Sequence, residues 1–227
     1  MEIREPNNIE IFNILIQEPM RSSTDVLVGI VSLILCYKLY KTKIASTSYK
    51  AFIFYFFFMG LTTLSAGTIG HAFQYIFSYN WKTLGWSFSA LSIFVLQQAS
   101  YRSLIDLIGK KVFKILNVAS FLQIFFFFGL IINPETRLFT VVQVNSAIGL
   151  MGMILPVHLY AVYQGNIKSS RWISLALLWG LVPAVVYNFE LGIHQWFDHS
   201  AVSHILMIIF LIIMYQGVKR IVPQHQF

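Results

Sequence analysis

Residues 200–218 read SAVSHILMIIFLIIMYQGV, an apolar stretch that contains no Asp, Glu, Lys or Arg and is followed directly by Lys219 and Arg220. A helix needs roughly 20 mostly apolar residues to cross the ~30 Å of hydrocarbon in a bilayer. This stretch is therefore typical of a transmembrane helix. It also contains an imidazole, His204, in a setting where ionisable side chains are rare.

The composition of the whole chain agrees with a membrane protein. Of its 227 residues, 57% are apolar and 11% are charged, and the mean hydropathy is +0.68. Soluble domains carry about 25% charged residues, so this chain lacks the surface of a soluble fold. The net charge of +7 would suggest nucleic acid as the partner of a soluble protein, but in a membrane protein it is loop charge that sets the orientation. No nucleic-acid partner is expected, and the single Cys36 excludes a disulfide scaffold.

Seven apolar runs predict an all-α fold, a bundle of seven transmembrane helices. The runs cover residues 26–40, 51–77, 84–100, 112–132, 139–163, 172–193 and 200–218. Because every connection is short, residues 24–220 are expected to form one membrane domain. An extracytoplasmic segment, residues 1–23, is expected before it and a cytoplasmic tail, residues 221–227, after it.

The first segment is not expected to be a cleaved signal peptide, because it lacks a basic start and Glu10 and Asn13 interrupt its apolar stretch. Its apolar residues favour a helix lying in the membrane interface. These residues are Ile9, Phe12, Leu15 and Ile16.

The basic residues predict the orientation of the bundle, because Lys and Arg stay on the cytoplasmic side of a membrane. With seven spans and the N-terminus outside, 12 of the 16 basic residues fall on the cytoplasmic side. Eight of the nine acidic residues fall on the outer side, and Asp106 is the exception. The sequence thus predicts an outer N-terminus and a cytoplasmic C-terminus.

Histidines at one depth of the membrane indicate a functional site, because ionisable groups are costly in hydrocarbon. His71 and His204 both lie roughly 6 to 9 Å below the outer surface, at 1.5 Å per residue. His199, Asp198 and Glu190 lie near the same layer. His71, His199 and His204 would supply the three ligands of a catalytic zinc site, which lowers the pKa of a water to near 7. Asp198 or Glu190 would then orient a ligand or move protons.

Structural interpretations of the same groups stay open. A lone intramembrane His such as His71 also occurs as a hydrogen-bond partner between helices, and Asp198 is equally suited to cap a helix. His158 lies near the cytoplasmic end of the fifth span, where carbonyls freed by Pro156 are its expected partners. His194 is equally suited to an interfacial loop and Glu190 to a solvated helix end, so the roles of His158, His194 and Glu190 stay open.

The arrangement resembles the CREST superfamily, which comprises the alkaline ceramidases, the progestin and adipoQ receptors and their relatives. The resemblance rests on the seven spans, on residues 65–73 (SAGTIGHAF) and on residues 198–204 (DHSAVSH). It implies a zinc ion on the membrane side that carries the N-terminus, and hydrolysis of a lipid amide by a zinc-activated water. It further implies that the metal ligands are His71, His199 and His204 and that Asp198 and Ser65 are catalytic.

The sequence departs from the family pattern at three places. The family has a Ser four residues before the His of the second span, where this chain has Gly67, and Ser65 lies six residues before His71. The His pair of the seventh span is His-x-x-x-His in the family, whereas four residues separate His199 and His204. Residues 78–92 contain no acid to match the family's Asp near the start of the third span.

The sequence therefore predicts a metal-dependent, membrane-embedded hydrolase that acts on a lipid amide or ester. The alternative is a non-catalytic seven-span receptor or small-molecule carrier without metal. Its polar cavity would be lined by Asn145, Gln97, Gln98 and Asn188. Both interpretations make the chain a multi-pass membrane protein with a lipid as substrate or ligand, and neither identifies the substrate, the oligomeric state or the membrane.

Overall fold

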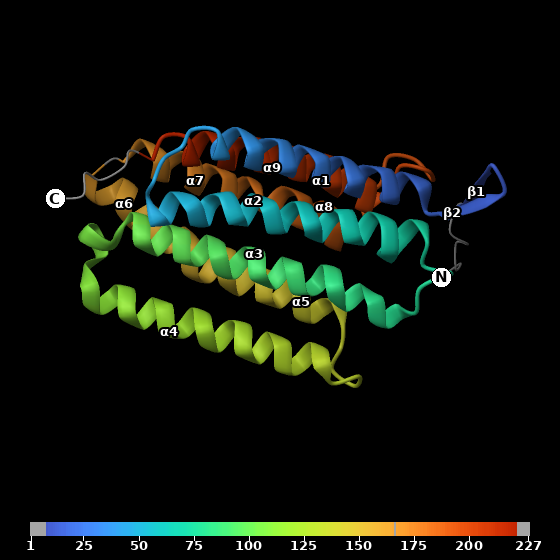
Figure 1. Ribbon diagram of the computed structural model, residues 1–227, viewed down its shortest axis with the longest axis horizontal. Coiled ribbons are helices and arrows are strands. Elements are labelled where there is room, and N and C mark those ends of the chain that lie inside the picture. Colours follow the sequence, from blue (N-terminus) through green and yellow to red (C-terminus); the bar gives the residue numbers. More distant parts are fainter. Residues whose placement is uncertain (1–7, 166, 222–227) are drawn as a thin grey trace.

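Seven helical rods run side by side through residues 8–165 and 167–221, the part of the chain that this computed structural model describes (Figure 1). Some rods are single helices and others join consecutive helical segments. In chain order the rods are α1 (Pro19–Tyr40); α2 (Thr47–Ser65) with η1 (Ala66–Ala72); α3 (Lys82–Ser103); α4 (Ile105–Ile132); α5 (Phe139–Ala147) with η3 (Ile148–Ile154) and α6 (Leu155–Gly165); α7 (Lys168–Trp179) with α8 (Leu181–Asn188); and α9 (His199–Val218). A short 3-10 turn, η2 (Tyr79–Trp81), precedes α3.

Six of these rods are long and apolar enough to cross a membrane, which indicates an integral membrane protein. The rod outside this group is α3, whose sequence begins at Lys82 and includes Arg102. Its helix also carries polar side chains, but Gln97 and Ser100 are buried inside the bundle. Contact with α2, α4 and η3 shields them, so α3 needs less apolar surface than its neighbours.

The rods alternate in direction, so the connections gather at two ends of the bundle (Figure 1). One end, called the hairpin end below, holds the starts of α1, α3, α5 and α9 and the ends of η1, α4 and α8. The opposite end, called the basic end, holds the connection between α1 and α2, residues 104–109 and the end of α9. Basic residues at or near this end include Lys41, Lys43, Lys110, Lys111, Lys219 and Arg220.

The segment before α1 is a β-hairpin, and the interfacial helix expected from Ile9, Phe12, Leu15 and Ile16 is wrong. Strands β1 (Asn8–Ile11) and β2 (Ile14–Gln17) pair antiparallel, with Ile11 opposite Ile14. Phe12 and Asn13 form the two-residue turn with positive φ angles of 52° and 61°. Isoleucines on both sides of this turn favour strands because β-branched side chains fit a pleated surface.

Helix α1 begins before the predicted start of the membrane domain at residue 24. Pro19 occupies its first turn, where a missing N–H group costs nothing and the fixed φ favours the helix. The first apolar run was expected to begin at residue 26, yet Ser22, Thr24 and Asp25 are buried within the helix. This early start places polar groups inside the hairpin end of the bundle.

The apolar core lies between α1, α2, α7 and α9, whereas α4 packs at the edge of the bundle (Figure 1). Buried core residues include Val28, Phe52, Phe56, Leu177, Leu211 and Met214. On α4 the large side chains of Phe121, Phe125 and Phe126 are exposed, as expected for a helix that faces lipid. The core therefore holds α1, which carries the polar groups described next, against α2 and α9.

Candidate functional site

The carboxylate of Asp25 lies between two of the predicted site histidines at the hairpin end. Its Oδ1 is 3.2 Å from Nε2 of His204 on α9, and its Oδ2 is 3.5 Å from Nε2 of His71 on η1. Asp25 is 3% exposed and comes from α1. We refer to Asp25, His71 and His204 as the Asp25 cluster. The structure thus brings together two residues expected from the sequence and one that was not.

The second nitrogen of each imidazole has its own partner. Nδ1 of His71 lies 2.5 Å from Oε2 of Glu18, and Nδ1 of His204 lies 3.0 Å from Oγ1 of Thr24. The Thr24 hydroxyl donates to the carbonyl oxygen of Met20 at 2.7 Å, so it accepts from His204. The Nδ1 atom of each ring therefore has a hydrogen-bond partner, and the Nε2 atom of each ring faces Asp25.

Glu18 lies directly before α1, outside the membrane-spanning helices. Burial raises the pKa of its carboxyl, but the hydrogen bond with His71 and the attraction of His71, Arg21 and Lys82 outweigh burial and lower the pKa below its usual value. Glu18 is consequently ionised at neutral pH. It therefore accepts the hydrogen bond from Nδ1–H of His71.

Arg21 connects the start of α1 to the start of α9. Its Nη1 is 2.6 Å from Oε1 of Glu18, and its Nε is 2.5 Å from Oδ2 of Asp198. The other oxygen of Asp198 accepts a hydrogen bond from the backbone N–H of Ala201 at 3.0 Å and caps α9. Asp198 thus has the capping role that the sequence left open, and it fixes the helix that carries His204.

The π-helical segment η1 brings His71 close to α1. π-helical turns are rare in proteins, and those that do occur often lie at functional sites. At Gly67 an added Cβ would lie 2.7 Å from the carbonyl oxygen of Ser22 and 3.0 Å from Cβ of Asp25. The Ser22 hydroxyl also donates to the carbonyl oxygen of Gly67 at 2.8 Å. Gly67 therefore allows the close approach of η1 and α1.

Two other predicted site residues have partners outside the Asp25 cluster. The ring of His199 packs edge-on against Tyr187, with 5.3 Å between the ring centroids. The Ser65 hydroxyl donates to the carbonyl oxygens of Leu61 and Thr62 within its own helix, at 2.6 and 3.0 Å. Their catalytic or metal-binding roles stay predictions.

Two of the four polar residues of the carrier interpretation, Gln97 and Asn145, belong to a separate hydrogen-bond network in the bundle. The Gln97 amide donates to Oε1 of Gln123 at 2.7 Å, and the Gln123 amide donates to Oδ1 of Asn145 at 2.9 Å. Asn188 is exposed at the end of α8 and donates to the carbonyl oxygen of Ala184. The side chains of Gln97 and Asn145 are thus hydrogen-bonded through Gln123, and these bonds join α3, α4 and α5.

His158 is buried near the basic end, away from the Asp25 cluster. Its Nδ1 lies 3.0 Å from Oγ of Ser170 on α7, so its partner in the described structure is a hydroxyl and not a carbonyl freed by Pro156. Its Nε2 has no hydrogen-bond partner among the described residues. This contact holds α6 against α7.

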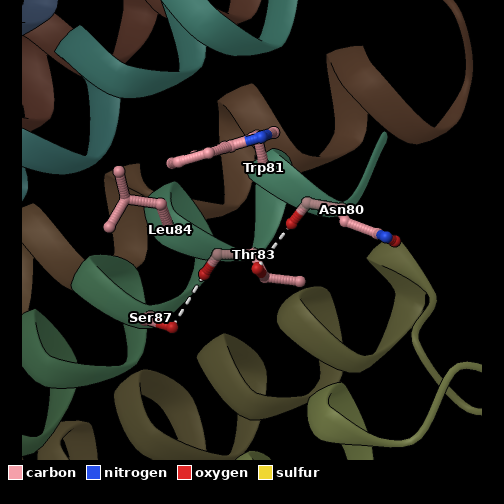
Figure 2. A pocket seen from close by; sticks show the side chains of 5 residues that line it. All are labelled: Asn80, Trp81, Thr83, Leu84 and Ser87. Atoms are coloured by element: carbon pink, nitrogen blue, oxygen red, sulfur yellow. Dashed lines mark hydrogen bonds between the residues drawn. The ribbon is translucent and has the colours of Figure 1, made fainter. Parts of the chain in front are cut away.

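A pocket of about 320 Å³ opens at His71, one member of the Asp25 cluster, at the hairpin end. It is lined by Gln17, Glu18, His71, Gln74 and Tyr75. A second pocket of about 350 Å³ is lined by Asn80, Trp81, Thr83, Leu84 and Ser87 (Figure 2). In this second pocket Thr83 and Ser87 donate to carbonyl oxygens of their own helical turns (Figure 2). The pocket at His71 is therefore the one with an ionisable ring in its wall.

The side chains of the Asp25 cluster do not have the spacing of a complete metal-binding site. Among the described residues, no group of three or more His, Cys, Asp or Glu side chains has that spacing. The two oxygens of Asp25 each face a different ring, at 3.2 and 3.5 Å. A single ion would require this carboxylate to turn.

Comparison with protein families gives a match over most of the chain. The model of the Family of unknown function (DUF6962) matches residues 20–223. This range contains Asp25, His71 and His204, whereas Glu18 and the β-hairpin precede it. A comparison with curated proteins found no match, and neither did a comparison with solved structures.

Proposed function

We propose that this chain, which belongs to the Family of unknown function (DUF6962), is a membrane-embedded hydrolase that cleaves a lipid amide or ester with the help of a bound metal ion. One observation supports the proposal above all others. The carboxylate of Asp25 and the Nε2 atoms of His71 and His204 converge from three different helical segments.

In the neutral form of each ring, the hydrogen bonds behind it place its one N–H at Nδ1. Thr24 donates its hydroxyl proton to Met20 and accepts from Nδ1–H of His204. Ionised Glu18 accepts from Nδ1–H of His71. A neutral imidazole carries a single N–H, so both Nε2 atoms hold lone pairs.

Lone pairs that face a buried carboxylate repel it unless a cation or a proton lies between them. Metal-binding His residues show the same arrangement, with the outer N–H held by a carboxylate or another acceptor. Asp25 reaches the two rings through its two different oxygens, at 3.2 and 3.5 Å, so a carboxylate and two imidazole nitrogens would be available to hold a cation.

The chain's own residues would divide the work as follows. Asp25, His71 and His204 would hold the ion, and Glu18 and Thr24 would keep the two rings in the tautomer that binding needs. A zinc ion, when bound, supplies a water that ionises near pH 7 and so provides a nucleophile at neutral pH. The pocket at Glu18 and His71 gives the polar part of a lipid access to this site.

The proposal includes seven membrane spans, with the hairpin end outside and the basic end in the cytoplasm. Lys and Arg concentrate at the end of the bundle opposite the Asp25 cluster, which is the distribution that the positive-inside rule describes. In this orientation α3, which begins at Lys82 and includes Arg102, is a span that packs against its neighbours α2 and α4. The site then faces the outer side of the membrane.

Elemental analysis of the purified protein tests the metal directly. We expect about one zinc per chain in the wild type, and loss of that zinc in Asp25→Asn, His71→Ala and His204→Ala. His199→Ala is the matched control, because its ring packs on Tyr187 outside the cluster, and it should keep the metal. A metal-free wild type would contradict the proposal. Zinc retained in Asp25→Asn but lost in His199→Ala would instead favour the ligand set His71, His199 and His204.

A further inference from the structure

The connection between α8 and α9 exposes large apolar side chains at the hairpin end. We refer to residues 189–197 as the apolar loop. Phe189 is 71% exposed and Ile193 is 78% exposed, and Leu191 and Trp196 are also exposed. Exposed apolar patches of this kind mark sites of interaction with a partner or with a membrane.

Backbone contacts hold the apolar loop in its shape. The N–H of Ile193 donates to the carbonyl oxygen of Phe197 at 3.0 Å. The N–H of Phe197 donates to the carbonyl oxygen of His194 at 2.9 Å. Gly192 packs so tightly that an added Cβ would lie 3.1 Å from Cα of Asp198. The backbone is therefore fixed by its own turn while the apolar side chains stay exposed.

The apolar loop continues a lipid-facing stripe of the preceding rod. The exposed residues Leu175, Leu178, Val182, Val185 and Phe189 recur every three or four positions and so share one face of the α7–α8 rod. This rod is apolar and long enough to cross a membrane, so its exposed stripe contacts hydrocarbon. The loop begins at the last residue of this stripe.

Another connection at the hairpin end provides an internal comparison. The α4–α5 connection, residues 133–138, contains Asn133, Glu135, Thr136 and Arg137, which suit water. The apolar loop has Glu190 as its only Asp, Glu, Lys or Arg. At the same end of the bundle, the side chains of the α4–α5 connection thus suit water, and those of the apolar loop suit lipid.

We propose that the apolar loop lies in the lipid surface at the hairpin end, with Phe189 and Ile193 in contact with acyl chains and Trp196 at the headgroup level. The partner is the surrounding bilayer, because the loop prolongs a helix face that already contacts it. Trp is favoured at this level because its ring is apolar and its N–H finds polar partners. Asp198 follows the loop and pairs with Arg21, so headgroups would reach the edge of the Asp25 cluster. This inference holds with or without a metal or a hydrolytic reaction.

Spin labels in lipid vesicles test the position of the apolar loop. Cys36 is the only native Cys, so Cys36→Ala provides a background in which Ile193→Cys or Phe189→Cys carries a single nitroxide. The label's accessibility to dissolved oxygen, which partitions into hydrocarbon, is compared with its accessibility to a water-soluble nickel complex. Phe125→Cys on the exposed face of α4 is the lipid control, and Glu135→Cys in the polar connection is the water control.

We expect the oxygen-to-nickel ratio at both loop positions to be severalfold above that at Glu135 and close to that at Phe125. A ratio at either loop position that is closer to the Glu135 value overturns the proposal. Circular dichroism of each labelled variant confirms that the helices are retained. All four labelled positions are exposed, so the substitutions leave the packed core intact.

Discussion

Arg21 and Asp198 form an ion pair of 2.5 Å that joins the first long helix of the chain to the last one. Arg21 also pairs with Glu18, which holds His71, while Asp198 caps the helix that carries His204. The two histidines of the Asp25 cluster are therefore positioned through one guanidinium group.

Substitutions at Asp198 separate its two contributions to stability. Asp198→Asn keeps a side-chain oxygen that can cap α9 but loses the charge that pairs with Arg21, whereas Asp198→Ala loses both. Loss of a cap costs about 1 kcal/mol, so we expect the Tm to fall from wild type to Asn and further to Ala. Thermal unfolding in detergent measures this order. Equal Tm values for Asn and Ala would show that capping contributes nothing.

Gly67→Ala should separate η1 from α1. The new methyl group would lie 2.7 Å from the Ser22 carbonyl oxygen, and such overpacking typically costs about 1 to 3 kcal/mol. We expect a lower Tm and weaker metal binding, because Asp25 and His71 move apart. Gly129→Ala is the matched control, since nothing lies within 4 Å of its added Cβ, and it should leave the Tm unchanged or raise it. A Tm for Gly67→Ala equal to that of the control would contradict the close approach.

Zinc should stabilise the wild type and not the Asp25→Asn variant. A ligand that binds only the folded state adds about 2.7 kcal/mol of stability at 100 times its Kd. We therefore expect chelation to lower the Tm of the wild type and zinc to restore it. In Asp25→Asn, which lacks the central carboxylate, neither treatment should change the Tm. A zinc response that survives in this variant would place the ion elsewhere.

Hydrolysis should depend on the same residues. With a fluorogenic lipid amide or ester as probe, we expect turnover that chelation abolishes and zinc restores. His204→Ala should be inactive at all zinc concentrations, whereas His199→Ala should keep its activity because its ring lies against Tyr187. Turnover that persists in the chelated wild type would exclude a metal-dependent reaction.

Glu18 predicts how stability changes in acid. Its pKa is lower in the folded protein than the usual 4.5, so folding favours its ionised form. The stability that it contributes is complete above the unfolded pKa of 4.5 and is lost as the pH falls through the lower folded value. The charged or titratable groups around it are His71, Arg21 and Lys82. In metal-free protein, the Tm difference between wild type and Glu18→Gln should narrow as the pH falls from about 5 to about 3. A constant difference would contradict the lowered pKa.

The helices were the part of the fold that could be predicted from the sequence, because long apolar runs have few other stable structures. Each of the seven runs corresponds to a helical rod in the described residues, although the boundaries moved. The β-hairpin was missed because its turn, Phe12-Asn13, lacks the glycine that normally marks a two-residue turn. The residues Ile9, Phe12, Leu15 and Ile16 also fit one face of a helix.

Asp25 was missed because the polar residues from Arg21 to Asp25 suggested a segment outside the membrane. A signal was present in the spacing. The buried residues Asp25, Val28, Ser32, Leu35 and Leu39 recur every three or four positions and so share one helix face. Pro19 also marks a helix start ahead of them. Contacts with other helices determine the π-helical turn at His71 and the tautomers of the two rings. These tertiary contacts cannot be read from a single sequence.

The pairing of the first helix with the last also has a consequence for biosynthesis. Asp25 leaves the ribosome early, but His204 follows only after nearly the whole chain has been made. Until α9 is inserted, the carboxylate of Asp25 lacks one of its two imidazoles, and a lone carboxylate is costly in hydrocarbon. We therefore expect that, until α9 is inserted, either α1 stays in a more polar surrounding, such as the edge of the insertion machinery, or the Asp25 carboxyl stays protonated.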